Sequence, residues 1–527
     1  DPCPLASPRN DSANGVPPLH DRVDPQRRGL LALALAAGVA PAFVACALLR
    51  TWKSDPFALG IASGCPRPDS VVLWTRLAPA AEPGAREPVS WELATDEGFR
   101  NVVRRGTEIV DADVAHSVHV QVSGLEPSRW YWYRFSAGGE ASVAGRTRTA
   151  PAPGREEALA FAIASCQRYD DGHYAAWRHL ADEAPDLVVF LGDYIYESAP
   201  RKDRVRTHSG TGAAKTLDDY RARYAQYKSD ADLRRIHASA PWILTWDDHE
   251  VQNDYANDRG QDLAPDFLAR RAAAYRAWWE HMPMPPSMRP LGPDLRVHDR
   301  YDWGALARFH VLDGRQYRDA HACPPPGRGG STTVNVADCP DLLRADRTIL
   351  GGAQERWLED GLAQRDVRWN LIAQQTLMAP FTWTKEGRYW TDGWAGYPAA
   401  RDRLFDAIVA RKVANPVVLS GDVHCNYVCD IKRRVDDPPG AVIASEFCGT
   451  SIASAGLPQS RVAAALPLNP HVRYGRSDER GYVALKVGAS RLDASLRVVS
   501  DAEDPNATIR TSARFSVESG RPGPQPG

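Results

Sequence analysis

Four separate apolar runs in this chain end in the same way, with residues that can bind a metal ion. The runs are AFAIAS (160–165), LVVFLG (187–192), WILTW (242–246) and VVLSG (417–421), and the residues that follow them are Cys166, Asp193, Asp247, Asp248, His249, Asp422 and His424. Short apolar runs that alternate with amphipathic helical patterns are typical of strands in a sheet covered by helices on both faces. Because the carboxyl ends of such strands face the ligand crevice, we expect these side chains to converge.

A convergence of carboxylates requires cations. Carboxylates gathered in one crevice repel each other and take up protons unless a metal ion neutralises them. A single Asp after Gly is typical of a turn or a helix cap, so the inference depends on the pattern that four strands share. The sequence therefore predicts a metal site with Asp193 at its centre.

The donor types indicate a mixed-metal site. The thiolate of Cys166 and the phenolate of Tyr196 suit a ferric ion. Carboxylates and an amide such as that of Asn253 suit Ca²⁺, Mg²⁺ or Mn²⁺. We therefore expect iron at one position and a divalent ion at the other.

The 527-residue chain divides into regions of different sequence character. Residues 1–26 are rich in Pro, Asp and Asn and are predicted to be a disordered leader. Between 55 and 150, alternating β-branched and aromatic residues predict an antiparallel sandwich of about seven strands. Residues 158–500 carry the α/β pattern, and residues 501–527 are predicted to be a C-terminal tail.

Residues 27–50 indicate export. Arg27 and Arg28 precede an uncharged apolar run with small residues near its end, which is typical of a twin-arginine signal and implies the twin-arginine translocase as a partner. A membrane anchor is the alternative, because the run is about long enough to span a bilayer. A third reading is a lipoprotein box that would lipidate Cys46. We expect a secreted, periplasmic or cell-surface protein.

Charge and cysteine content exclude some functions. Lys plus Arg (64) nearly balance Asp plus Glu (66), so there is no electrostatic case for nucleic-acid binding, and the expected partner is a small molecule. The nine cysteines lack paired zinc-binding spacing. Cys323 and Cys339 flank a Pro/Gly-rich loop that a disulfide would close. Cys425 and Cys429, beside His424, have two alternatives: they join the metal site, or they pair with each other or with Cys448.

Several motifs together resemble one family. They are GDYIYE (192–197), WDDHEVQND (246–254), DGWAGYPAAR (392–401), SGDVHCN (420–426) and NPHVRYGRSDERGY (469–482). In this order they are similar to the PhoD-type alkaline phosphatases of the metallophosphoesterase superfamily, and residues 55–77 resemble that family's N-terminal sandwich. The resemblance implies a four-layer α/β sandwich of two mixed sheets flanked by helices, after an all-β domain of the fibronectin or immunoglobulin type. It also implies a phosphate-ester hydrolase that uses Fe³⁺ and Ca²⁺, with Mn²⁺ or Mg²⁺ as alternatives at the second position.

The resemblance also implies roles for single residues. Asp193 would bridge the metals, with Cys166, Tyr196 and His424 on the iron and Asp422 on the calcium. In this family one segment supplies a ligand of the second metal and a polar group that faces the phosphate. The residues that match it are Asp248, His249 and Asn253, and which of them has which role is open. Arg221 matches the arginine that contacts phosphate, with Arg223 as the competing choice.

Chemistry supports the same assignment. A metal-held oxygen nucleophile would attack the phosphorus, Arg221 would bind the phosphoryl oxygens and His249 would protonate the leaving group. The substrate would be a phosphate monoester or diester, including a phospholipid or a teichoic-acid-like polymer. The alternatives are a phospholipase D-like phosphodiesterase and, in a different class, a non-catalytic surface protein stapled by metals. A purely structural metal site would not need open polar groups such as Arg221 and His249.

Overall fold

The computed structural model describes residues 52, 54–78, 86–434 and 441–527. The predicted leader, the predicted export segment and Cys46 lie outside these residues. Within the described part, no helix is both long and apolar enough to span a bilayer. The α-helices are α1 (Ala175–Asp182), α2 (Leu217–Lys228), α3 (Ala231–Ser239), α4 (Phe267–His281), α5 (Gly351–Leu362), α6 (Pro398–Ala410) and α7 (Gln459–Ala465).

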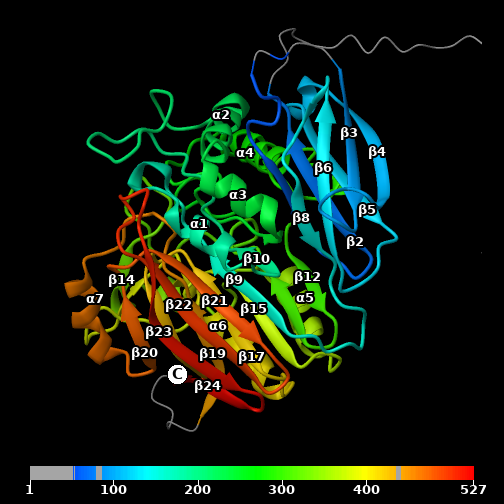
Figure 1. Ribbon diagram of the computed structural model, residues 1–527. Coiled ribbons are helices and arrows are strands. Elements are labelled where there is room, and N and C mark those ends of the chain that lie inside the picture. The colour runs from blue at the N-terminus through cyan, green and yellow to red at the C-terminus, as the bar shows by residue number, and fades with distance from the viewer. Residues whose placement is uncertain (1–51, 53, 79–85, 435–440) are drawn as a thin grey trace, which may run out of the picture. The chain divides into compact units, whose positions relative to one another are not determined.

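Ten strands form the larger of the two main sheets (Figure 1). In spatial order they are β24 (Arg521–Pro526), β23 (Ile509–Glu518), β22 (Arg491–Val499), β21 (Gly481–Val487), β9 (Leu159–Ala164), β10 (Leu187–Phe190), β11 (Pro241–Leu244), β1 (Ile61–Gly64), β2 (Ser70–Arg76) and β5 (Ser117–Ser123). Strands β9, β10 and β11 are parallel neighbours, and α1, α2 and α3 occur in the connections between them. The three strands are almost fully buried, which explains their continuous apolar character.

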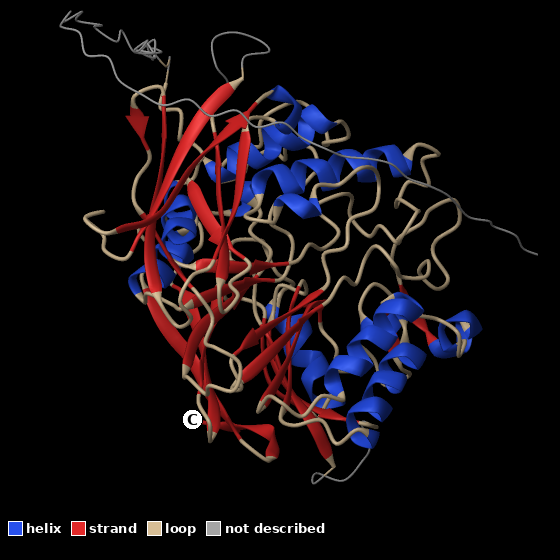
Figure 2. Ribbon diagram, turned by 90° about the vertical axis from the view of Figure 1, so that its right-hand side faces the viewer, coloured by secondary structure: helices blue, strands red, loops and turns tan. Residues whose placement is uncertain are grey.

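The second main sheet has seven strands. Their order is β12 (Asp299–Trp303), β13 (Ala307–Val311), β15 (Trp369–Thr376), β17 (Pro416–Gly421), β19 (Val442–Cys448), β18 (Asn426–Lys432) and β20 (Val472–Arg476). The rings of Phe161 on β9 and Phe309 on β13 are 5.2 Å apart, so the two sheets share one core. A second core joins this sheet to α5 and α6. Figure 2 shows the helices in two groups with strands between them, which confirms the predicted four-layer fold.

The N-terminal β region shares a sheet with the α/β part. A separate sheet contains β4 (Val102–Val110), β3 (Glu87–Ala94), β6 (Trp130–Ala137) and β7 (Glu140–Ala141), and β8 (Gly145–Arg148) pairs with β6. Side chains of this sheet, such as Tyr133, form one core with residues of β1, β2 and β5, such as Leu73. Strand β1 pairs in parallel with β11, so one face of the sandwich continues directly into the ten-stranded sheet.

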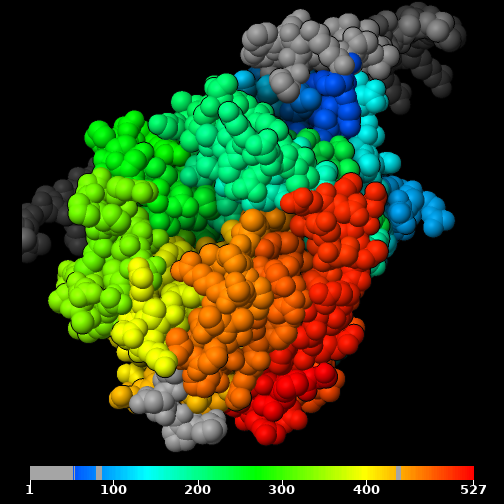
Figure 3. Space-filling view, turned by 90° about the vertical axis from the view of Figure 1, so that its left-hand side faces the viewer, coloured from blue at the N-terminus to red at the C-terminus, as the bar shows by residue number. Residues whose placement is uncertain are grey.

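The C-terminal residues are part of the fold. Strands β23 and β24 extend the ten-stranded sheet beyond β22, and β21 pairs with β9. In Figure 3 these segments, in red, form one flank of the surface. The prediction of a tail over 501–527 was wrong, because alternating buried residues such as Phe515 and Val517 pack these strands onto the core.

The disulfide between Cys323 and Cys339 is present, which confirms that prediction. It closes a loop that carries β14 (Thr333–Asn335), and this strand pairs with β16 (Arg388–Trp390). The three cysteines near His424 are buried and free, so the alternative in which they pair with each other was wrong: Cys425, Cys429 and Cys448.

Candidate metal centre

The predicted ligands lie on unusual backbone directly after the strands. Cys166, Asp193, Asp422 and His424 have positive φ angles of 59°, 60°, 66° and 51°. For residues other than glycine, this conformation costs roughly 1 to 3 kcal/mol and persists only where the surroundings enforce it. Such backbone strain clusters at functional sites, so four instances among the predicted ligands point to this crevice.

A glycine allows two of the strand ends to meet. Gly192 precedes Asp193 with a φ of 113°, and a Cβ at this position would lie 2.5 Å from the Cβ of Asp247. Only glycine avoids both the strain and the clash. The glycine of the GDYIYE motif therefore brings the end of β10 against the segment that follows β11.

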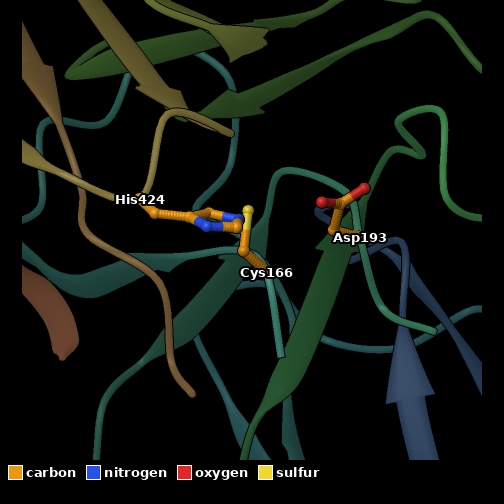
Figure 4. A group of neighbouring side chains, drawn as sticks. All are labelled: Cys166, Asp193 and His424. Carbon is orange, nitrogen blue, oxygen red and sulfur yellow. The ribbon is translucent and has the colours of Figure 1, made fainter. Parts of the chain in front are cut away.

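The predicted iron ligands come together. Ligand atoms of Cys166, Asp193 and His424 all lie within 4.8 Å of one another (Figure 4). The Tyr196 hydroxyl is 2.7 Å from Asp193 Oδ2 and 3.1 Å from His424 Nε2. A thiol, a carboxylate, an imidazole and a phenol thus surround one point.

The tautomer of His424 suits metal binding. Its Nδ1 is 2.7 Å from the carbonyl oxygen of Ala455, which can only accept, so Nδ1 carries the proton. Burial lowers the pKa of His424 to about 3, so the ring is neutral. The lone pair of Nε2 is then directed toward Tyr196 and available to a metal.

A second group of ligands adjoins the first. Asp193, Asp248 and His249 form one cluster within 4.8 Å, and Asp193, Asp247 and Asp422 form another. Asp193 belongs to all three clusters, which is the position expected of a bridging ligand. Asn253 lines the same cavity as Asp193 and Asp422.

The charge at this point calls for cations. Asp248 Oδ1, Asp422 Oδ2 and Asp247 Oδ2 are buried and accept no hydrogen bond. Burial, together with neighbouring charges, raises the pKa of Asp193 and Asp422 well above the usual range and that of Asp247 to about 7. Buried carboxylates with unused oxygens cost free energy unless a positive ion binds them. The residues therefore fit a metal centre with one set of softer donors and one set of carboxylates.

Sequence reasoning missed the partner of His249. The Nδ1 of His249 is 2.7 Å from Glu197 Oε2, and the other oxygen of Glu197 accepts the backbone N–H of Asn253 at 2.9 Å. Burial lowers the pKa of His249, but the carboxylates of Glu197, Asp193 and Asp248 outweigh it and raise that pKa well above the usual range. The hydrogen-bonded carboxylate of Glu197 therefore favours the protonated form of the ring. The sequence signal that could have identified this partner is Glu197 itself, the acidic last residue of the GDYIYE motif.

A third carboxylate group was also missed. Asp248, Asp254 and Asp392 are buried with oxygens within 4.8 Å of one another. Asp392 accepts hydrogen bonds from two arginines and a histidine: Arg315, Arg318 and His321. Arg315 also donates to Asp247, so it connects this group to the centre. Asp254 and Asp392 occur in the motifs WDDHEVQND and DGWAGYPAAR, but their proximity depends on the fold.

One cavity of about 470 Å³ contains the carboxylates. Its polar lining includes the carboxylates of Asp193, Asp248, Asp392 and Asp422. Its wall is apolar and aromatic, and includes Leu377, Phe381, Trp383, Trp390, Tyr427 and Val462. The aromatic loop 381–398 thus borders the crevice.

Arg221 does not reach the centre. Its Nε and Nη2 atoms each donate to the buried carboxylate of Glu280 at 2.7 Å, and it is absent from the described cavity lining. The competing Arg223 is buried and donates to the backbone carbonyls of Tyr196 and Ser198. The predicted phosphate contact is therefore corrected, because both guanidiniums are engaged elsewhere.

This placement of Arg221 is testable by substitution. We expect Arg221→Gln to lower stability by about 2 kcal/mol, because Glu280 loses a bidentate partner and keeps only Arg276. The kcat/KM for p-nitrophenyl phosphate should change by less than about twofold. Thermal unfolding and steady-state kinetics check both. A large loss of kcat/KM with unchanged stability would return Arg221 to the active site.

Comparisons with known proteins agree with this geometry. The PhoD-like phosphatase family model matches residues 161–496, and the model of its N-terminal domain matches residues 43–151. The chain belongs to the PhoD-like phosphatase family. Alkaline phosphatase D of Bacillus subtilis (strain 168) is 43% identical over 491 residues, which cover 90% of this chain and 82% of that protein.

Solved structures give the same result for this PhoD-like phosphatase. A structure of PhoD matches with a TM-score of 0.84 and 43% identity, covering 89% of this chain and 91% of that one. The purple acid phosphatase PPD1 from yellow lupin (Lupinus luteus) seeds matches with a TM-score of 0.55 over 87% and 74% of the two chains. At 14% identity, that second likeness shows only the shared fold. The predicted family, fold and enzyme class, a phosphoric ester hydrolase, are confirmed.

Proposed function

We propose that this PhoD-like phosphatase hydrolyses phosphate monoesters and diesters at a mixed iron and calcium centre. The observation that carries the proposal is the convergence, in one cavity, of several buried carboxylates with unused oxygens and of His249, which is hydrogen-bonded to Glu197. Metals balance the carboxylates, and the histidine supplies an acid beside them. A metal centre with only a structural role would not need that acid.

The ligands divide by chemistry. Fe³⁺ would be held by Cys166, Tyr196, Asp193 and His424, because thiolate, phenolate and imidazole groups are suitable ligands for a ferric ion. Asp193, Asp248, Asn253 and Asp422 would hold Ca²⁺, with Mn²⁺ or Mg²⁺ as alternatives. When bound, the metals supply neutralisation of the phosphate charge and activation of the oxygen nucleophile.

Protein groups handle the leaving group. Glu197 accepts a hydrogen bond from the Nδ1–H of His249 and thereby fixes the ring, which leaves Nε2–H as the donor available to the cavity. Transfer of the Nε2 proton from His249 to the departing alkoxide oxygen lowers the activation free energy for breaking the P–O bond. His249 is thus assigned as general acid, and Glu197 as the residue that positions it.

The cavity wall favours diesters as well as monoesters. A monoester needs only space for phosphate and one substituent, whereas a diester places a second group against the wall. The apolar surface of Leu377, Phe381 and Val462 offers such a place. A phospholipase D-like phosphodiesterase is therefore the second candidate activity, with phospholipids or teichoic-acid-like polymers as candidate substrates.

Export remains part of the proposal. Arg27 and Arg28 with the following apolar run support the twin-arginine translocase as partner and a secreted or periplasmic location. The Cys323–Cys339 disulfide is consistent with such an oxidising compartment.

The test compares p-nitrophenyl phosphate with bis-p-nitrophenyl phosphate as substrates of the purified protein, alongside elemental analysis. We expect hydrolysis of both, with iron and a divalent metal present. A calcium chelator should abolish activity, and added Ca²⁺ should restore it. If the metal-replete protein hydrolyses neither ester, the chain is a non-catalytic binding protein and the proposal fails.

A further inference from the structure

Arg461, on α7, is an arginine of the cavity with no anionic partner. Among the described residues that line the cavity, it is the only arginine or lysine. Its guanidinium stacks on the ring of Trp383 at 4.8 Å from the centroid. Within the described part of the chain, no hydrogen bond or ion pair engages that guanidinium. Stacking leaves the edge N–H groups of the guanidinium free to donate.

Arginines close to α7 in the sequence are all engaged. Arg473 pairs with Asp430, Arg476 pairs with Asp478, and Arg480 donates to backbone carbonyls. The helix that carries Arg461 is fixed, because Val462 is buried and Gln459 accepts hydrogen bonds from Ser477. Arg461 is therefore an unpaired cation on an anchored element.

Arg461 lies at the mouth of the cavity. It is exposed, and its neighbour Leu457 is 38% exposed, whereas the cavity-lining carboxylates of Asp193 and Asp248 are 1% and 4% exposed. In Figure 3 the orange segment that includes α7 lies beside the yellow segment around residues 380–400. A group bound by Arg461 therefore lies outward from the scissile phosphate.

A row of aromatic rings connects the two ends. The ring of Trp383 is 4.9 Å from that of Phe381, and the ring of Phe381 is 5.2 Å from that of Tyr427, three residues after His424. A substituent of the ester can lie along these rings from the metal centre to Arg461. Its inner part meets apolar surface and its outer end meets a positive charge.

We propose that Arg461, held by Trp383, binds an anionic group on the non-scissile substituent of the substrate. The preferred substrate is a phosphodiester that carries a second phosphate-like or carboxylate group beyond a short apolar spacer. This inference rests on the proposed phosphodiesterase activity and assigns the outer part of its binding site.

The experiment uses three p-nitrophenyl phosphodiesters whose second substituent is propyl, phosphonopropyl or choline. We expect the wild-type holoenzyme to prefer the phosphonopropyl ester over the propyl ester by about fivefold in kcat/KM. Arg461→Gln should remove this preference through KM, and Arg461→Glu should shift it toward the choline ester. Trp383→Leu should weaken it, because the guanidinium loses its support. Arg476→Gln, which removes a nearby arginine paired with Asp478, is the matched control and should keep the preference.

The possible outcomes separate the two proposals. Hydrolysis of none of the three esters contradicts the phosphodiesterase activity itself. Hydrolysis with equal kcat/KM for the propyl and phosphonopropyl esters overturns the role of Arg461. An equal loss on all three esters in Arg461→Gln also overturns it, because Arg461 would then contact the scissile phosphate.

Discussion

Asp193→Asn is expected to abolish phosphatase activity and metal binding together. Asp193 contributes to three of the four overlapping clusters of potential ligands, so both proposed metal positions lose a negatively charged ligand at once. We expect kcat to fall by at least about a thousandfold, because charge stabilisation by the metals is lost with them. Steady-state kinetics and elemental analysis of the same preparation check the two losses.

The Asp193→Asn substitution tests the effect of the negative charge separately from any effect on the fold. Asn has nearly the same size as Asp and tolerates the left-handed backbone at this position, where φ is 60°. Asp203→Asn is the matched control, because Asp203 is an exposed aspartate with a φ of 55° away from the cavity. The control should keep activity and metals. An Asp193→Asn enzyme with full activity would show that the centre lies elsewhere.

His249→Gln is expected to slow hydrolysis in a way that depends on the leaving group. Loss of a general acid typically costs a factor of about 100 to 10,000 for poor leaving groups that need a proton. An alkyl phosphate should show this loss, whereas p-nitrophenyl phosphate, whose phenolate leaves unaided, should lose much less. Rates for both esters with one enzyme preparation check the difference.

Glu197→Gln should reproduce part of this effect. The amide keeps a hydrogen bond to His249 Nδ1 but removes the charge that favours the protonated ring. We expect an intermediate loss on the alkyl ester with metal content unchanged. Equal losses on both esters, accompanied by loss of metal, would instead make His249 a ligand and contradict its role as acid.

The sequence by itself predicted the candidate ligands and their order along the chain. Short apolar runs are followed within one to three residues by Cys166, Asp193, Asp248, Asp422 and His424, so the local pattern placed them at strand ends. The carboxyl ends of β9, β10 and β11 meet at one edge because these strands are parallel neighbours, so the convergence of Cys166, Asp193 and Asp248 could be predicted without the structure. Asp422 and His424 follow β17 of the seven-stranded sheet, and the packing of the two sheets brings them to the same point. The disulfide between Cys323 and Cys339 could also be predicted.

Only the tertiary structure decided which charged groups face the site. Arg221 and Arg461 are both arginines on helices, and nothing local shows that the first pairs with Glu280 while the second lines the cavity. The contact between Glu197 and His249 joins residues that are 52 positions apart in the sequence. Long side chains reach partners that depend on how whole elements pack, so their roles are set by the assembled fold. Strand pairing is also set by the assembled fold. The segments β23 and β24 look like a tail in the sequence, but they are strands of the main sheet because β23 pairs with β22 and β24 pairs with β23.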